Sequence, residues 1–142
     1  MSLSAKRVMS GTFGGVYVDG ELLAEISSFQ AKHTFSRDDV QMAGEMAVDS
    51  KITNTKGTGS ITLKKVYSRF AGYVEQIQSG RDIRFTILAK LDDPDAFGAE
   101  RVGLYNVSFD EMTLMDWAVG KTQDLSYPFR FTRSELLEGV PA

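Results

Sequence analysis

The stretch "GVYVDGELL", residues 15–23, sets an Asp-Gly pair between two short apolar runs. Asp-Gly favours a two-residue turn with positive φ at both positions, so the stretch predicts a tight β-hairpin. Outward from it, apolar and polar residues alternate in several further runs, which is typical of strands with one buried face. The predicted strands span residues 22–35, 58–66, 83–91, 101–109, 113–119 and 122–132. With 13 glycines against 3 prolines, the chain predicts a mainly β domain of strands joined by turns.

Two local irregularities are predicted within these strands. In the run 22–35 the alternation changes phase at Ser27–Ser28. This indicates a β-bulge, because one extra residue turns the following side chains to the other face. In the last run, Pro128 stands among the polar positions, and proline cannot donate a ladder hydrogen bond. That run is therefore predicted to be an edge strand locally, or to be bulged there.

One amphipathic helix is predicted at about residues 68–79. Ser68 is a good N-cap, and Gly80 suits the left-handed residue that follows a helix. Between them the apolar side chains recur with helical spacing: Phe70, Tyr73, Val74 and Ile77. A single helix with one apolar stripe is expected to lie against a sheet.

Residues 36–57 show no clear periodicity and are predicted to form a long loop. Loops of this length inside a compact domain usually have a function, and apolar residues on such a loop indicate that it docks on another surface, such as a second chain. The candidate residues for this contact are Ser36, Asp38, Val40, Met42, Met46, Val48, Ile52 and Lys56.

Three strands carry faces with almost no large apolar residue. Two interpretations stay open: an outer face in contact with solvent, or the wall of a water-filled channel in an oligomer. The residues of these faces are Gln30, Lys32, Thr34, Ser60, Thr62, Lys64, Asn106, Ser108 and Asp110.

The bulk composition limits the possible chemistry. The chain has 142 residues, enough for one domain with its own core, and a net charge of −3. It has no cysteine, which excludes a thiol nucleophile, a zinc–thiolate site and a disulfide framework. No apolar run is long enough to predict a membrane span, and no secretory signal or cofactor motif is seen.

The acidic stretch 92–98 is the best candidate for a cation site. As an EF-hand loop starting at Asp93, it would place Asp95 at position 3, but Phe97 at position 5 and Leu104 at position 12. Because those positions must supply oxygen ligands, the pattern fails, and a turn capped by aspartate side chains is the better prediction. A weak cation site, or a β-sandwich ligand-binding module that uses this stretch, remains the alternative.

Catalytic motifs are poorly supported. His33 is the only histidine, it shares the parity of neighbouring strand residues, and no nucleophile motif accompanies it. The glycine-rich stretches "GTFGG" and "KGTGS" lead into strands rather than helices, so they lack the context of a phosphate loop. We therefore expect no enzymatic activity.

Five stretches carry a resemblance to a known family. They are "SGTFGGVYVDG", "FQAKHTFSRDDVQMAGEMAVDSK", "GTGSITLKKVYSRF", "LDDPDAFGAERVGLYNVSFDEMTLMDWAVG" and "YPFRFT". In this order, over about residues 8–133, the chain resembles tail tube proteins of phages and phage-derived particles. It is most similar to the XkdM-like family of defective prophages and to the tube proteins of R-type bacteriocins.

The resemblance implies a β-sandwich or open barrel of two sheets with one flanking α-helix, as a single tail tube domain over residues 1–142. It implies homohexameric rings that stack into the hollow inner tube of a contractile tail, with the loop 36–57 between subunits and the polar strand faces toward the lumen. A net charge of −3 per chain would discourage DNA from sticking to such a ring.

The expected partners are other copies of the chain, the tail sheath protein, and the baseplate and tail terminator proteins. In phages of the family DNA passes through the lumen, here expected without specific binding, whereas bacteriocins of this type carry no DNA. The expected location is a virion tail or phage-tail-like particle assembled in the bacterial cytoplasm, and no cofactor is implied. A secretion-system tube of the same fold is the alternative.

Overall fold

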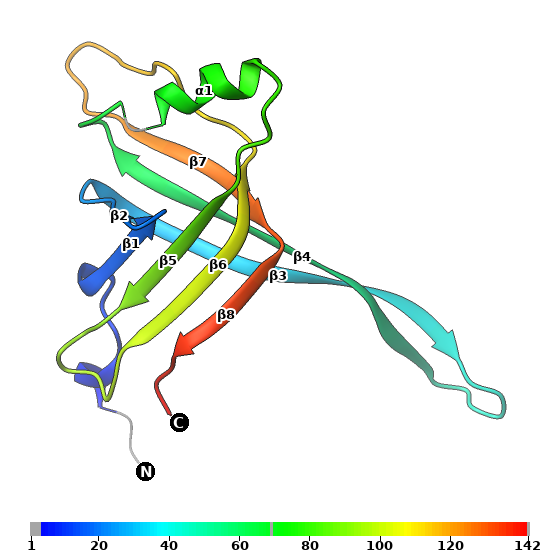
Figure 1. Ribbon diagram of the computed structural model, residues 1–142. Coiled ribbons are helices and arrows are strands. Elements are labelled where there is room, and N and C mark those ends of the chain that lie inside the picture. The colour runs from blue at the N-terminus through cyan, green and yellow to red at the C-terminus, as the bar shows by residue number, and fades with distance from the viewer. Residues whose placement is uncertain (1–3, 69, 142) are drawn as a thin grey trace.

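The computed structural model describes residues 4–68 and 70–141 and consists mainly of antiparallel strands (Figure 1). The elements are two short 3-10 helices, Ala5–Arg7 and Gly11–Phe13, the strands β1 Gly14–Val18, β2 Glu21–Leu22, β3 Ile26–Gln41 and β4 Val48–Lys64, the helix α1 Ala71–Gln78, and the strands β5 Phe85–Leu91, β6 Glu100–Phe109, β7 Asp124–Phe131 and β8 Arg133–Glu138. Within the described residues, no helix has the length and apolar character needed to cross a bilayer.

The strands form two sheets that share β6. The hydrogen-bonded order is β2-β1-β5-β6-β7-β4-β3, and β8 pairs with the first part of β6, where β7 does not reach. We call β1, β2, β5, β8 and the first part of β6 the small sheet, and β3, β4, β7 and the end of β6 the long sheet. The expected fold class, two β-sheets with one flanking helix, is confirmed.

Buried side chains of both sheets meet in one hydrophobic core. Val16, Ile87 and Leu104 come from the small sheet, and Ile61 and Phe129 come from the long sheet. Each follows the alternation of its strand, because successive side chains of a strand point to opposite faces.

The helix α1 closes one end of this core. Just before it, the ring of Phe70 lies 5.1 Å from the ring of Phe109 and 5.0 Å from that of Tyr127. From the first turn of the helix, Tyr73 packs edge-on against Phe85 at 5.0 Å. Aromatic pairs in these edge and tilted arrangements add to the stabilisation that burial gives.

Several local predictions are confirmed. Asp19 and Gly20 have φ values of 49° and 83° between β1 and β2, as the hairpin requires. The register of β3 shifts between Ile26 and Ser28, which is the predicted bulge. Gly80 has φ of 97°, and its N–H donates to the carbonyl of Ile77, so α1 ends as expected.

The position of Pro128 follows from where β6 ends. Its carbonyl accepts a hydrogen bond from the N–H of Asp110, the residue directly after β6. The nitrogen and carbonyl of one strand residue point to the same side, so the missing N–H of Pro128 faces the side on which the ladder stops. The prediction of a local edge is confirmed.

Four features differ from the predictions. Residues 113–119 form no strand, because their alternating apolar residues have no neighbouring strand to pair with and lie exposed. Phe70, not Ser68, occupies the N-cap position of α1, and it makes no side-chain cap. The expected loop 36–57 is mostly two strands. The strand β8 was not predicted.

The fold depends on one close approach of strands that can be tested. A Cβ atom added at Gly59 would collide with the carbonyl oxygen of Gln30 and would lie 2.6 Å from Cζ of Phe129. Gly59→Ala is therefore expected to lower the free energy of unfolding by about 1–3 kcal/mol, measured by urea denaturation. The matched control is Gly72→Ala in α1, where nothing lies within 4 Å of the added atom. A Gly59→Ala protein as stable as the control would show that this approach is dispensable.

Candidate assembly surfaces

A long hairpin projects from the body of the molecule (Figure 1). The strands β3 and β4 have 16 and 17 residues, and β7 pairs with β4 only from Gly57 to Lys64. Beyond Gly57 the two strands pair only with each other, as far as Gln41 and Val48. We call residues 34–56 the arm. Residues 42–47 form its tip.

The arm is thus an ordered hairpin rather than the predicted loop. Of the predicted contact residues, Ser36, Asp38 and Val40 lie in β3, Met42 and Met46 lie in the tip, and Val48, Ile52 and Lys56 lie in β4. The pattern was hidden for two reasons. Neither face of the arm is buried, so the alternation of apolar and polar residues is weak. A second register shift, between Ser36 and Arg37 of β3, also changes the parity of β4.

One face of the arm continues the core face of the long sheet. Phe35 pairs with Thr55, and after the register shift Arg37 pairs with Ile52 and Gln41 with Val48. Because Thr53 is the extra residue of the bulge, Ile52 and Val48 stay on the side of Phe35 rather than crossing to the other face. The arm therefore carries three exposed apolar side chains on one side, of which Phe35 stacks beside the His33 ring at 6.4 Å.

Two glycines fix the base of the arm. Gly57 lies opposite Phe131 and Gly59 lies opposite Phe129, and each ring occupies the space that a Cβ atom would need. His33 packs edge-on against Phe131 at 5.0 Å, and its Nε2 lies 2.7 Å from the hydroxyl of Ser134 in β8. The histidine is a strand residue with a partner, as predicted.

The outer side of the long sheet is polar across all of its strands. One row runs Lys32, Thr58, Arg130 and Ser108, and the next runs Gln30, Ser60 and Pro128. The cross-strand register thus brings together most of the predicted polar positions on one face. Asn106 is the exception. It has φ of 59° at the corner where β6 changes sheets, and its amide donates to the hydroxyl of Thr132 at 2.8 Å.

The charges on this polar face are mainly paired. Lys64 lies 3.5 Å from Asp124, and Arg130 lies 2.7 Å from Asp110. The hydrogen bond and charge of Asp110 raise the pKa of the Arg130 guanidinium above its usual value. Among the described residues, Lys32 and Lys56 have no ion pair. The net negative charge of the chain therefore does not lie on this face.

At the corner between the sheets, β8 is held by side chains of β6. Tyr105 donates to Glu135 at 3.0 Å, and the guanidinium of Arg133 lies 4.6 Å from the Tyr105 ring. The hydrogen bond to Glu135 is the main cause that raises the pKa of Tyr105. These contacts hold β8 as a continuation of β7 past the Thr132 bend.

The acidic stretch 92–98 is a capped turn, as predicted. Asp93 is only 5% exposed, and its carboxylate accepts hydrogen bonds from the backbone N–H groups of Ser10 and Asp95, both at 2.9 Å. The carboxylate thus stabilises the turn and fastens the N-terminal segment to it. In the described part of the chain, no three histidine or carboxylate side chains cluster as metal ligands would.

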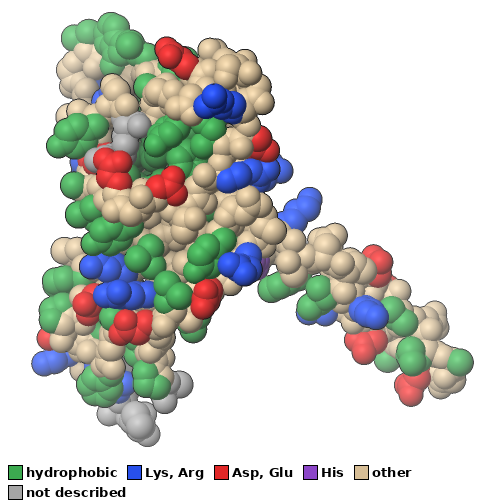
Figure 2. All heavy atoms as spheres, viewed as in Figure 1, with side chains coloured by type: hydrophobic (Ala, Val, Ile, Leu, Met, Phe, Trp, Pro, Cys, Tyr) green, Lys and Arg blue, Asp and Glu red, His purple; other side chains and the backbone are tan. Residues whose placement is uncertain are grey.

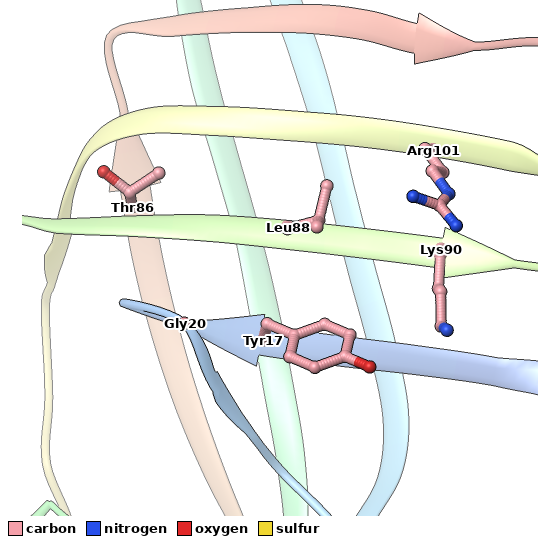
Figure 3. Close-up of a pocket in the computed structure, with 6 residues that line it drawn as sticks. All are labelled: Tyr17, Gly20, Thr86, Leu88, Lys90 and Arg101. Carbon is pink, nitrogen blue, oxygen red and sulfur yellow. The ribbon is translucent and has the colours of Figure 1, made fainter.

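A shallow groove lies on the outer side of the small sheet (Figure 3). It measures about 330 Å³ and is lined by Tyr17, Gly20, Thr86, Leu88, Lys90 and Arg101. Lys90 lies 5.6 Å from the Tyr17 ring, and Arg101 pairs with Glu138 at 3.5 Å. This lining holds no nucleophile–base pair.

Sequence reasoning missed a second exposed apolar region. The segment after β6 carries Leu114, Met115, Trp117 and Val119, all of them exposed. The alternation of the last three predicted a strand. The neighbouring positions Asp116 and Gly120 carry no large apolar side chain. This pattern fits a strand with one buried face and an exposed loop equally well.

The arm, the wide polar sheet face and the exposed apolar side chains are features of a structural β-protein with large uncovered surfaces. Comparisons with known proteins agree. Residues 1–138 match the family model described as "Phage tail tube protein". The chain is 34% identical over 134 residues to "Phage-like element PBSX protein XkdM" of Bacillus subtilis, covering 92% of this chain and 91% of the relative.

Solved structures share the fold. A cryo-EM structure of the anti-feeding prophage tube-terminating cap aligns with a TM-score of 0.76 at 8% identity, over 98% of this chain and 97% of that one. A chain of the sheath–tube complex of an extracellular contractile injection system aligns with a TM-score of 0.72 at 10% identity, over 95% of this chain and 98% of that one. The chain belongs to the phage tail tube protein family, and the resemblance stated from the sequence is confirmed.

The capping role of Asp93 can be tested directly. Asp93→Ala is expected to lower the free energy of unfolding by about 1–3 kcal/mol, because two backbone N–H groups lose the charged acceptor of part-buried hydrogen bonds. Faster hydrogen exchange of the Ser10 amide should accompany this loss. Asp92→Ala is the matched control, since that neighbouring side chain is exposed. Equal stability of the two variants would exclude the capping role.

Proposed function

We propose that the chain is the repeating subunit of a contractile tail tube, in which six copies close into a ring and rings stack into a hollow tube. Residues 1–142 act as one tube domain, and the function is assembly rather than catalysis. The polar face of the long sheet lines the lumen, and the arm makes contacts between subunits and rings.

The polar face is the single observation that carries this proposal. It extends over four strands with the same parity, while the opposite face of the same strands forms the core. A sheet with one face buried in the core and the other face in contact with water suits the wall of a channel. Lys32 and Lys56 would leave that wall mildly basic. DNA in the lumen would therefore meet uncompensated lysines rather than an acidic surface.

The free edge of β3 supports ring closure. In the described part of the chain β3 pairs with β4 alone and ends the long sheet. A 16-residue edge strand is open to pairing with another chain, and closing six sheets into one barrel removes such edges. Six-fold closure also requires contacts between unlike surfaces of neighbouring copies.

The partners and location follow from the family. The cap, the sheath–tube complex and a baseplate appear among the solved relatives of the fold. We infer that this chain contacts a sheath, a baseplate and a terminator in a virion tail or phage-tail-like particle, and that it assembles in the bacterial cytoplasm. The similarity to a protein of the PBSX phage-like element favours a prophage-derived particle over a secretion-system tube.

The ligand-binding alternative has lost its main support. It relied on free carboxylates in the stretch 92–98, but Asp93 is buried and both of its oxygens accept backbone hydrogen bonds. A carboxylate occupied in this way is a poor ligand for a cation.

Shortening the arm tests the proposal. Replacing residues 40–49 by Asn-Gly would close the hairpin between Asp39 and Ser50, which are paired in the native register. We expect a folded monomer, because no arm residue belongs to the core, and no tubes by negative-stain electron microscopy. The wild type, concentrated or seeded with baseplates, should give hollow tubes with six-fold end views.

The two parts of the proposal can fail separately. Asp92→Ala, far from the arm, should assemble as the wild type does. Normal tubes from the shortened chain would remove the arm from assembly. Compact wild-type monomers, even at high concentration with seeds, would contradict the tube function itself.

A further inference from the structure

The end of the molecule opposite the arm carries an exposed apolar surface. The loop between β6 and β7 exposes Leu114, Met115, Trp117 and Val119, and the segment after β4 exposes Val66 and Tyr67. The start of the segment after β4 lies beside the end of the β6–β7 loop, because the N–H of Lys65 donates to the carbonyl of Gln123 at 3.2 Å. We call these six residues the end patch. Figure 2 shows apolar side chains gathered at this end of the molecule.

The arm and the end patch lie at opposite ends of the long sheet. The strand β7 starts with Asp124 beside Lys64, at the end patch, and finishes with Phe131 beside Gly57, at the base of the arm. At about 3.3 Å per residue, the arm from Gly57 to its tip is about 30 Å long, which exceeds the roughly 23 Å of the part of β4 within the body, Gly57 to Lys64. A second copy displaced along the strands would therefore bring its arm to the end patch of the first.

We propose that the arm of one copy docks on the end patch of another, with Met46 and the apolar side of the arm packed against Trp117 and Val119. This inference rests on the proposed tube function and names the surface that the arm requires. Each surface has exposed apolar residues, and the contact joins two unlike surfaces, as head-to-tail stacking demands. Tryptophan and methionine are enriched in such interface cores.

Burial rather than charge drives this contact. The end patch has Lys65 and Lys121 beside it, but also Glu111 and Asp116, so its charge is balanced. The distal part of the arm, residues 38–49, has four acidic and no basic residues. Salt is therefore expected to change docking little, because an end patch of balanced charge neither attracts nor repels the acidic arm strongly.

Trp117 is the only tryptophan of the chain and reports on the end patch without labelling. It is 70% exposed in the free chain. We expect tube formation to shift its fluorescence emission to shorter wavelength and to reduce acrylamide quenching several-fold. Trp117→Ser should leave the thermal stability of the monomer nearly unchanged, because the side chain is mostly exposed and lies outside the core, and should raise the protein concentration needed for tubes at least tenfold.

Cross-linking identifies what covers Trp117. The chain has no cysteine, so two introduced thiols are unique. Met46 and Val119 are 97% and 91% exposed, and the double variant Met46→Cys, Val119→Cys should fold normally. In assembled tubes, a short bismaleimide should join it into ladders of covalent multimers. Either single variant should give no ladder, and neither should the control pair Met46→Cys, Leu137→Cys, whose second site lies on β8.

The outcomes separate this inference from the proposed function. Tubes with a freely quenched Trp117, or with no ladder from the Met46–Val119 pair, would overturn the docking and leave the tube intact. Protection of Trp117 only after sheath protein is added would assign the end patch to the sheath and also overturn it. A wild-type chain that forms no tubes would remove the proposed function, and the docking with it.

Discussion

The close packing of two phenylalanine rings on two glycines sets the register on which the whole molecule depends. Phe129 and Phe131 of β7 lie over Gly59 and Gly57 of β4, where no other residue would leave room for the rings. Because the side-chain period of a strand is two, this register decides which residues of β4 face the core. A shift by one residue would move Ile61 to the wet side and Ser60 into the core. The polar face exists because that shift is blocked.

The same register reaches into the arm. Beyond Gly57 the strands have no core to align them, and only the pairing of β3 with β4 carries the alternation outward. The bulge at Thr53 keeps the apolar residues on the core side after the strands leave the body. One side of the arm thus continues the core face of the long sheet, but the small sheet does not extend over it. A surface of this kind is costly to leave in water, which is why a second chain is its natural cover.

Whether a feature could be predicted from the sequence depends on how far apart along the chain the residues that decide it lie. The Asp19–Gly20 turn, the bulge after Ile26 and the Gly80 cap are each decided by a few neighbouring residues, and all three are found. The polar face could also be predicted, because the alternation of polar and apolar residues that defines it is visible within each strand. The strand β8 and the segment 113–119 could not, because strand formation there depends on a distant partner. The arm was missed because neither of its faces is buried and a bulge changes the parity of β4. Residues 113–119 alternate as a strand does but have none to pair with, whereas β8 has one in β6.

An isolated subunit with these features needs some protection against premature pairing. The long free edge of β3 and the apolar side of the arm both invite association, as exposed edges do. The four acidic residues of the distal arm lie on the same segment, and like charges on two approaching arms repel. Such charges act as gatekeepers beside an apolar stretch that must stay exposed until its partner arrives. Repulsion between arms does not oppose docking on the charge-balanced end patch. In the proposed tube the same residues would disfavour arm-to-arm pairing and permit head-to-tail stacking, which is the discrimination that an ordered tube requires.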